Sequence, residues 1–413
     1  MAQSSEPRFD MIVAGTGYSG LILASALSHT LGNDIRVAAV GPAPELLDDP
    51  DNPRAFALSA SSKTLLQAIG VWDAIGDDAQ PVLEIELTDS PLHAGVRPVL
   101  LTYENVLESG APASYIVPAG RLGAALARAV AQLANVEVVG ADRVEGFDVV
   151  EGGLIARAAG GKVLETSLLI AADGRASALR SHADIDSIGW QHRQTGIVTI
   201  IGHEKPHNGR AVQHFLPAGP FAILPLVGNR SCITWSEHTD EAQRILALDD
   251  AAFLDEVDLR FGGKLGELEL VGQRRSFPLA THVARRFVAE RFALLGDSAH
   301  GVHPIAGQGL NLAIRDIAAL VECIADGARV GLDFGDTVVL ERYEKWRRFD
   351  STLSAGVFDG INRLFAKDWP LLRSAREIGL GVIDRLPGIK GLLVSEAAGL
   401  TGDVPKLLKG ELV

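Results

Sequence analysis

A glycine-rich turn near the N-terminus has residue types and spacing suited to binding a pyrophosphate. An apolar strand predicted over 9–14 leads into the turn, and an apolar helix predicted over 21–31 follows it. The turn consists of Gly15, Thr16, Gly17, Tyr18, Ser19 and Gly20. In such a turn the glycines allow a tight bend and close approach of backbone to phosphate, and the helix N-terminus offers N–H groups and partial positive charge. The flanking strand and helix favour this interpretation over a plain glycine-rich turn.

Two other predicted strands end in a carboxylate beside a glycine. The apolar run 168–172 ends in Asp173-Gly174, and the run 291–295 ends in Gly296-Asp297. A carboxylate at such a strand end points into the crevice where open α/β sheets bind their ligands. Asp297 therefore suits ribose or ribityl hydroxyls, which donate hydrogen bonds to a carboxylate. For Asp173 a second interpretation stays open, in which its carboxylate caps the following helix.

The loop after Asp297 leads into a long apolar helix, predicted over 310–325, that packs against the sheet. The N-terminus of this helix faces the crevice and suits an anion, such as the oxygen locus of a reduced flavin. His300 and His303 lie in the loop without a third metal ligand nearby. We therefore expect both to be local hydrogen-bonding residues and expect no metal site.

The acidic residue that usually binds a ribose hydroxyl at the end of the second strand is missing. Counting along the strand predicted over 36–40 places Gly41 at this position. Either Glu45 reaches in from the next loop, or backbone and water hold the ribose. If the space is free, Gly41→Glu is expected to tighten cofactor binding by about 1 kcal/mol.

The composition is that of a large acidic protein. Its 413 residues predict two or three domains. With 38 Lys and Arg against 52 Asp and Glu, the net charge of −14 argues against a nucleic-acid partner. Cys232 and Cys323 stand in unrelated contexts, so neither a disulfide nor a zinc framework is indicated. The chain shows no signal-peptide pattern and no apolar window long enough to cross a bilayer, so we expect a cytoplasmic protein.

The order of the predicted elements indicates an α/β protein with an antiparallel middle part. The N-terminal β-α-β unit is typical of a parallel sheet. Turn signals separate the middle strands, which favours antiparallel pairing. These strands are predicted over 84–89, 98–103, 196–203, 210–216, 221–226 and 230–235. From about residue 338 the pattern is helical and is interrupted by Pro370, Pro387 and Pro405.

The glycine turn, Asp173-Gly174 and Gly296-Asp297 occur in an order that resembles the FAD-dependent aromatic-ring hydroxylases related to para-hydroxybenzoate hydroxylase. A closer resemblance is to the ring hydroxylases of ubiquinone biosynthesis. It is carried by segments 53–59, 66–72, 215–220, 224–226, 296–311 and 397–400. Segment 296–311 is the most specific of these. The resemblance covers nearly the whole chain, and Gly41 is a departure from it.

The resemblance implies a role for each matching residue. The glycine turn would hold the FAD pyrophosphate, Asp173 and Gly174 would form the Asp-Gly site, and Gly296 and Asp297 would reach the ribityl chain. Arg54 and Arg121 would contact the phosphate or ribityl region, and surface salt bridges are the alternative for both. The segment lining the isoalloxazine would contain Pro304, Gly307, Gln308, Gly309, Leu310 and Asn311.

The implied fold is a Rossmann-type FAD/NAD(P)-binding domain with an antiparallel β-sheet substrate domain and a C-terminal helical tail. The FAD-binding domain is expected to be discontinuous, over 1–80, 106–183 and 276–350. The substrate domain is expected over 81–105 and 184–275, and the helical segment over 351–413.

The implied reaction is hydroxylation of the aromatic ring of a polyprenyl phenol intermediate in ubiquinone biosynthesis, with NAD(P)H as electron donor and O₂ as oxygen source. A hydroxylase of another aromatic compound, a flavoprotein reductase or dehydrogenase that does not use oxygen, and a non-enzymatic FAD-binding subunit remain as alternatives. A flavin-dependent halogenase is disfavoured because Trp190 and Trp235 are isolated. The residue that helps the phenol to ionise is not identifiable from the sequence.

The apolar residues of the tail have two interpretations. They either pack in the core, or dock on a partner subunit of a biosynthetic complex or peripherally on the inner membrane that stores the quinone. These residues are Leu371, Leu372, Ile378, Leu380, Val382 and Ile383. The sequence leaves open whether the protein forms an oligomer.

Overall fold

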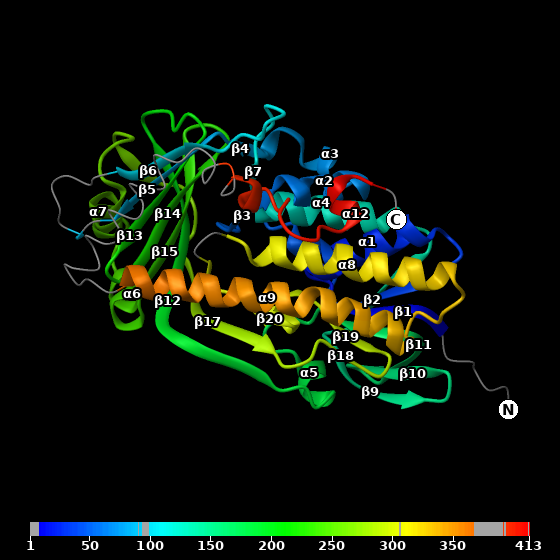
Figure 1. The fold of residues 1–413 in the computed structure, drawn as a ribbon. Coiled ribbons are helices and arrows are strands. Elements are labelled where there is room, and N and C mark those ends of the chain that lie inside the picture. The colour runs from blue at the N-terminus through cyan, green and yellow to red at the C-terminus, as the bar shows by residue number, and fades with distance from the viewer. Residues whose placement is uncertain are drawn as a thin grey trace.

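A parallel sheet and a larger, mainly antiparallel sheet form the framework of the protein (Figure 1). The computed structural model describes residues 8–89, 91–92, 99–304, 307–366, 391, 394–411 and 413. The six apolar tail residues named above lie outside this part of the chain. Every helix in the described ranges is too short or too polar to span a bilayer.

The first sheet contains eight strands. They are β1 (Arg8–Ala14), β2 (Val37–Gly41), β8 (Val136–Gly140), β9 (Val144–Val150), β10 (Gly153–Ala158), β11 (Lys162–Ala171), β18 (Val288–Ala289) and β19 (Phe292–Leu294). β1 lies at the centre and pairs in parallel with β2 on one side and β11 on the other. β2 and nearly all of β1 are buried, as expected for parallel strands covered on both faces.

Helices cover this sheet. They are α1 (Tyr18–Leu31), α4 (Ala119–Ala131), α5 (Ala178–His182), α8 (Gly309–Arg329) and α9 (Thr337–Ala366). α1 packs against α4 and α8, and α8 packs against α9. Figure 1 shows α9, in orange, running past both large sheets, and it contacts strands of the second sheet as well as α8.

The second sheet contains nine strands. They are β5 (Glu84–Asp89), β6 (Val99–Glu104), β12 (Ser187–His203), β13 (Arg210–Leu216), β14 (Gly219–Leu226), β15 (Arg230–His238), β16 (Leu268–Leu270), β17 (Arg275–Ala284) and β20 (His300–Gly301). All of its pairs are antiparallel except β5 with β13. α6 (Thr239–Leu246) and α7 (Asp250–Phe261) pack on it through an apolar cluster that includes Phe253 and Trp235.

A small third sheet and the C-terminus complete the described structure. The remaining elements are β3 (Ala55–Ser59), β4 (Gln80–Val82), β7 (Ser114–Pro118), α2 (Ala60–Ala68), α3 (Trp72–Ile75), α12 (Lys406–Lys409) and the 3-10 helices η1 (Pro44–Leu47), η2 (Gly76–Asp78) and η3 (Gly296–Ser298). The Ser61 N–H donates to the Ala398 carbonyl (3.0 Å), and the Lys406 N–H donates to Glu322 of α8 (2.8 Å). Residues 394–411 therefore pack against α2 and α8.

The predicted fold class is confirmed. The N-terminal β-α-β unit and the mainly antiparallel second sheet are both present, and the parallel β5–β13 pair is the one difference from the expected pairing. α9 continues through the domain boundary expected at 350/351. The division into domains remains a prediction.

Candidate active site

The candidate crevice is expected at the carboxyl ends of the adjacent strands β1 and β11, where the sheet order reverses from one side of β1 to the other. Open α/β sheets bind ligands at such points. Gly15 has φ +127°, and a Cβ there would lie 2.3 Å from the Ala172 oxygen. A Cβ on Gly20 would lie 1.9 Å from the Gly15 oxygen, so both positions require glycine.

The N-terminus of α1 is open toward this crevice. A Cβ on Gly17 would meet nothing within 4 Å, and no side chain caps the helix at this residue. The first turn carries no acidic residue. The backbone can therefore approach a ligand closely, and the turn fits a pyrophosphate.

Asp173 stands beside the glycine turn with an unused hydrogen-bond acceptor. Its Oδ2 accepts from the Leu179 N–H at 3.4 Å, whereas its buried Oδ1 has no partner among the described residues. Burial raises the pKa of this carboxyl, and nearby donors only partly offset the effect. Ser177, not Asp173, caps α5, so the helix-cap interpretation accounts for only part of the Asp173 side chain. The free oxygen fits a donor group on a ligand.

The Gly296-Asp297 turn is fixed by a buried ionic network. Asp316 of α8 accepts from the Gly296 N–H (3.2 Å) and from His300 Nε2 (2.6 Å), and it pairs with Arg347 Nε of α9 (2.8 Å). Burial alone would raise the pKa of Asp316, but His300 and Arg347 outweigh it and hold this pKa below its usual range. His300 is thus the local hydrogen-bonding residue that the sequence predicted. Neither Asp316 nor Arg347 was identified as a site residue from the sequence.

The Asp297 side chain is exposed next to this network, while its backbone oxygen accepts from His282 Nε2 of β17 (3.0 Å). The carboxylate is therefore free to accept from hydroxyl groups of a ligand. The backbone contact shows that the second sheet helps to hold the turn.

Asp297→Ala is expected to weaken FAD binding by about 1.5–3 kcal/mol, because a charged acceptor of hydrogen bonds is lost. The melting temperature should fall chiefly when FAD is present, since the lost contribution is ligand binding. FAD titration and thermal unfolding with and without FAD check this. An equal loss of stability without FAD would make Asp297 a structural residue.

The N-terminus of α8, like that of α1, is not capped by a side chain. It begins after Gln308 without a side-chain cap, and no acidic residue lies in its first turn. Gly307 has φ +62°, and a Cβ there would lie 3.1 Å from Ala57 of β3. Gly309 faces open space and Leu310 is buried, whereas Pro304 is half-buried. Their contact with an isoalloxazine remains a prediction.

Asn311 ties α8 to the small sheet. Its Oδ1 accepts from the Ser59 N–H (3.0 Å) and Ser62 Oγ (2.8 Å), and its Nδ2 donates to the Ala57 oxygen (2.7 Å). The side chain is thus engaged within the protein. Its visible role is to fix the position of the α8 N-terminus.

The two arginines implied by the resemblance lie in different surroundings. The exposed Arg54 places its guanidinium 5.6 Å from the Phe56 ring centroid, and Phe56 packs edge-on against Tyr18 of the glycine turn. Arg121 is exposed and pairs with Asp78 at 3.2 Å, which is the surface salt bridge of the alternative interpretation. Arg54 therefore lies at the crevice, and a flavin contact of Arg121 remains a prediction.

Thr16 explains the missing acid at Gly41. Thr16 Oγ1 donates to the Pro42 oxygen (2.6 Å), and a Cβ on Gly41 would lie 2.5 Å from this Oγ1 and 2.9 Å from the Thr16 nitrogen. The space beside Gly41 is therefore filled. The condition under which Gly41→Glu would tighten binding is not met, and a larger side chain there would clash with Thr16.

Gly41→Ala is expected to lower the free energy of unfolding by about 1–3 kcal/mol through overpacking against Thr16, and to weaken FAD binding. Gly140 of the adjacent β8 is the matched control, because a Cβ there would meet nothing within 4 Å. Gly140→Ala should change stability by less than about 0.5 kcal/mol. Urea unfolding of both variants makes the comparison, and equal effects would refute the steric argument.

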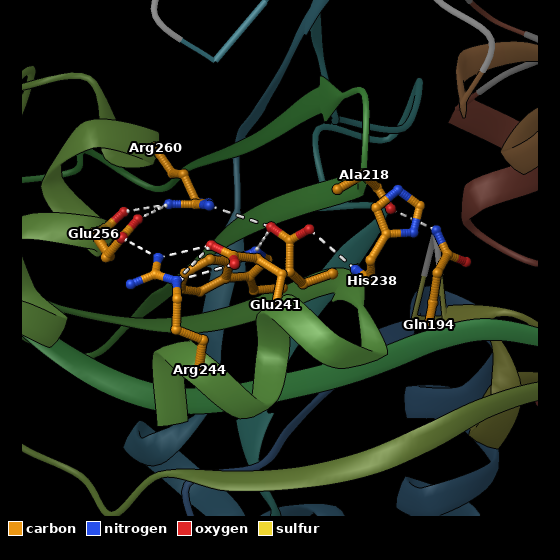
Figure 2. Close-up of polar contacts among 9 residues, drawn as sticks. Gln194, Ala218, His238, Glu241, Arg244, Glu256 and Arg260 are labelled. Atoms are coloured by element: carbon orange, nitrogen blue, oxygen red, sulfur yellow. Dashed lines mark hydrogen bonds and ion pairs between the residues drawn. The ribbon is translucent and has the colours of Figure 1, made fainter. Parts of the chain in front are cut away.

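Ionic contacts hold the helices on the outer face of the second sheet (Figure 2). Arg260 pairs with Glu237 (3.2 Å) and Glu256 (2.7 Å) and stacks over Trp235 at 4.1 Å, and Arg244 bridges Glu256 to Glu241. This cluster fixes α6 and α7 to the sheet. Gln194 Nε2 donates to the Ala218 oxygen (2.6 Å) and holds the turn between β13 and β14.

The geometry fits FAD. The candidate site offers two uncapped helix N-termini, the exposed Asp297 carboxylate and an Asp173 oxygen that has no partner among the described residues. A Cβ on Gly296 would lie 3.0 Å from Ala313 of α8 and 3.5 Å from Ser19 Oγ of α1, so the three segments meet. Among the described residues, no three His, Cys, Asp or Glu side chains are grouped as metal ligands.

Comparison with known proteins agrees with this geometry. The model of the FAD binding domain family matches residues 8–348. Ubiquinone hydroxylase UbiL of Rhodospirillum rubrum is 36% identical over 98% of this chain and 94% of its own length. The Caenorhabditis elegans ubiquinone biosynthesis monooxygenase COQ6 is 28% identical, over 95% of this chain and 96% of its own length. The structure of p-nitrophenol 4-monooxygenase PnpA from Pseudomonas putida superposes with a TM-score of 0.77 at 18% identity, over 96% of this chain and 99% of that one.

Fold and site together define a flavoprotein of the aromatic-hydroxylase type. The chain belongs to the FAD binding domain family, and it is an FAD-dependent monooxygenase.

Proposed function

We propose that this chain hydroxylates the aromatic ring of a polyprenyl phenol on the route to ubiquinone. The observation that carries the proposal is the similarity over almost the full length to a protein named ubiquinone hydroxylase. In the balanced reaction, the ring C–H, O₂, NAD(P)H and a proton give the phenolic ring C–OH, water and NAD(P)⁺.

FAD, when bound, supplies the electron transfer and oxygen activation. The residues of the chain would bind and orient FAD and would shield the reacting atoms from water. The glycine turn would hold the pyrophosphate, Asp173 would accept a hydrogen bond from a donor group of the ligand, and Asp297 would accept from the ribityl hydroxyls. The α8 N-terminus would favour negative charge on the flavin ring. The buried strands of the second sheet would exclude water from the reacting atoms.

A hydroxylase of another aromatic compound is the second candidate, and the similarity to PnpA in fold alone is compatible with it. A strain that lacks this gene should accumulate a less-hydroxylated quinone precursor, detected by mass spectrometry of extracted lipids. Normal ubiquinone without precursor, in a strain with no second copy, would contradict the ubiquinone substrate and leave the monooxygenase class intact.

We further propose that α9 brings the enzyme to the anionic membrane surface where such a substrate resides. Phe349, Leu353 and Val357 lie on successive turns of α9 and are 75%, 54% and 48% exposed. The exposed cations Lys345 and Arg348 lie on the same helix, just before these three apolar residues. Apolar side chains flanked by cations suit the interface of an anionic bilayer.

The purified enzyme should therefore cosediment with phosphatidylglycerol vesicles. The triple variant Phe349→Ser, Leu353→Ser, Val357→Ser should lose most of this binding, because burial of apolar area at the interface is removed. Leu46→Ser is the matched control, since Leu46 is 72% exposed on the separate element η1. Unchanged binding of the triple variant would exclude α9 as the docking surface.

A further inference from the structure

Within the described part of the chain, the buried side chain of His303 makes no hydrogen bond. It is 1% exposed, and neither ring nitrogen has a partner among the described residues. This differs from the local hydrogen bonding that the sequence predicted. A neutral imidazole carries one donor and one acceptor, and a buried polar group without a partner is costly in free energy. Such a group beside a ligand site calls for a partner in the ligand.

A β-bulge in the second sheet lies next to His303. The pairing of β12 with β17 shifts register between Gln191 and Thr195, and Arg193 within the bulge has φ +52°. Bulges re-aim side chains and are frequent next to active sites. Here the ring of His192 lies edge-on to the His303 ring, with centroids 5.0 Å apart.

His192 is anchored from two other elements. Its Nε2 shares a hydrogen bond with Thr281 Oγ1 of β17 (2.8 Å), and its Nδ1 lies 3.9 Å from Asp359 Oδ1 of α9. The same Asp359 oxygen accepts from Trp190 Nε1 (2.9 Å). These contacts fix the surface against which His303 packs. They make His192 a positioning residue.

We propose that His303 forms the hydrogen bond to the ring hydroxyl of the aromatic substrate, and that His192 sets its orientation. The proposal rests on the proposed function. His303 directly precedes Pro304 and lies six residues before α8 begins at Gly309, where the flavin ring is expected. Its ring packs against His192 of β12 in the second sheet. This position is therefore between cofactor and substrate.

The charge state of His303 selects the class of ligand. Burial, with a smaller effect of His192, lowers its pKa to about 3, so the ring is neutral at pH 7. A neutral imidazole matches an uncharged phenol, which also donates one hydrogen bond and accepts one. It offers no cation to a carboxylate. The site should therefore prefer a prenylated phenol to a benzoate.

The test is the dissociation constant of the FAD-loaded protein for a short-chain ortho-prenyl phenol, followed by perturbation of flavin absorbance. His303→Leu should raise this constant about tenfold and leave the constant for FAD within about twofold. His303→Gln, which keeps a donor and an acceptor, should recover most of the affinity. The matched control is His207→Gln, because both His207 nitrogens are engaged at the far end of the sheet. In wild-type protein the corresponding prenyl benzoate should bind at least about tenfold more weakly than the phenol.

Unchanged phenol affinity in His303→Leu, or an equal loss in His207→Gln, would overturn the proposal. A large change in the FAD constant without phenol would assign His303 to the cofactor and would overturn it as well. If His303→Leu fails to fold, the proposal is decided by two other results. These are the phenol affinity of His303→Gln and the comparison of phenol with benzoate in the wild type. Failure of the wild type to bind any phenol would instead count against the proposed function.

Discussion

Replacing Arg347 with methionine is expected to lower the free energy of unfolding by about 3–5 kcal/mol and to abolish tight FAD binding. Arg347 and Asp316 are both buried, and they pair at 2.8 Å. Removing the cation leaves the Asp316 carboxylate buried with less compensation. Because Asp316 also accepts from the Gly296 N–H, the turn that carries Asp297 should loosen as well.

Arg342→Met is the matched control on the same helix. Arg342 pairs with Asp326 at 2.8 Å, but this pair is substantially exposed. Exposed pairs contribute about 0–1 kcal/mol, so this variant should remain close to wild type. Urea unfolding and FAD titration of both variants provide the measurement, and similar losses in the two would contradict the role given to the buried network.

Lowering the pH from 7 to 5 is expected to cost up to about 4 kcal/mol of stability through two buried histidines. Burial, helped by Arg180, lowers the pKa of His282 to about 4, and burial with His192 lowers that of His303 to about 3. Below about pH 6.5 the unfolded chain takes up protons that the folded protein refuses, so stability falls as the pH decreases. The loss continues until the folded-state pKa values are reached.

His282→Gln and His303→Gln should each remove about half of this pH dependence, because the substituted side chain does not titrate. His29→Gln, at an exposed position on α1, is the control substitution. Urea unfolding at pH 7 and pH 5 compares the three variants with wild type. An unaltered pH dependence in both buried-site variants would mean that other groups control acid stability.

The parts of the fold that depend on local sequence were predictable. Gly15 and Gly20 are required by close backbone approaches within one β-α-β unit, so their spacing alone indicates the turn. The apolar runs ending in Asp173 and Asp297 likewise predicted two strand ends at the crevice. The parallel pairing of β5 with β13 was not predictable, because it joins strands far apart in the chain and leaves no periodic pattern.

The site features that were not predicted from the sequence all depend on contacts between two residues that are distant in the chain. Asp316 and Arg347 look like ordinary charged residues of amphipathic helices, and only the packing of α8 on α9 shows that they are buried together. The block at Gly41 arises from Thr16 on the neighbouring loop, so counting positions could not find it. The one available signal was the charged pair Arg315-Asp316, which interrupts the otherwise apolar run 312–321 of α8.

The most direct test of the central claim is a turnover of the FAD-loaded enzyme with NAD(P)H, a short-chain polyprenyl phenol and heavy-isotope O₂, followed by mass spectrometry of the ring product. We expect one heavy oxygen atom in the ring product for each NAD(P)H consumed in productive turnover. Label should be absent when light O₂ and heavy water are used instead. NAD(P)H oxidation that yields no labelled ring, whichever phenol is supplied, would contradict the assignment of this chain as a polyprenyl-phenol hydroxylase.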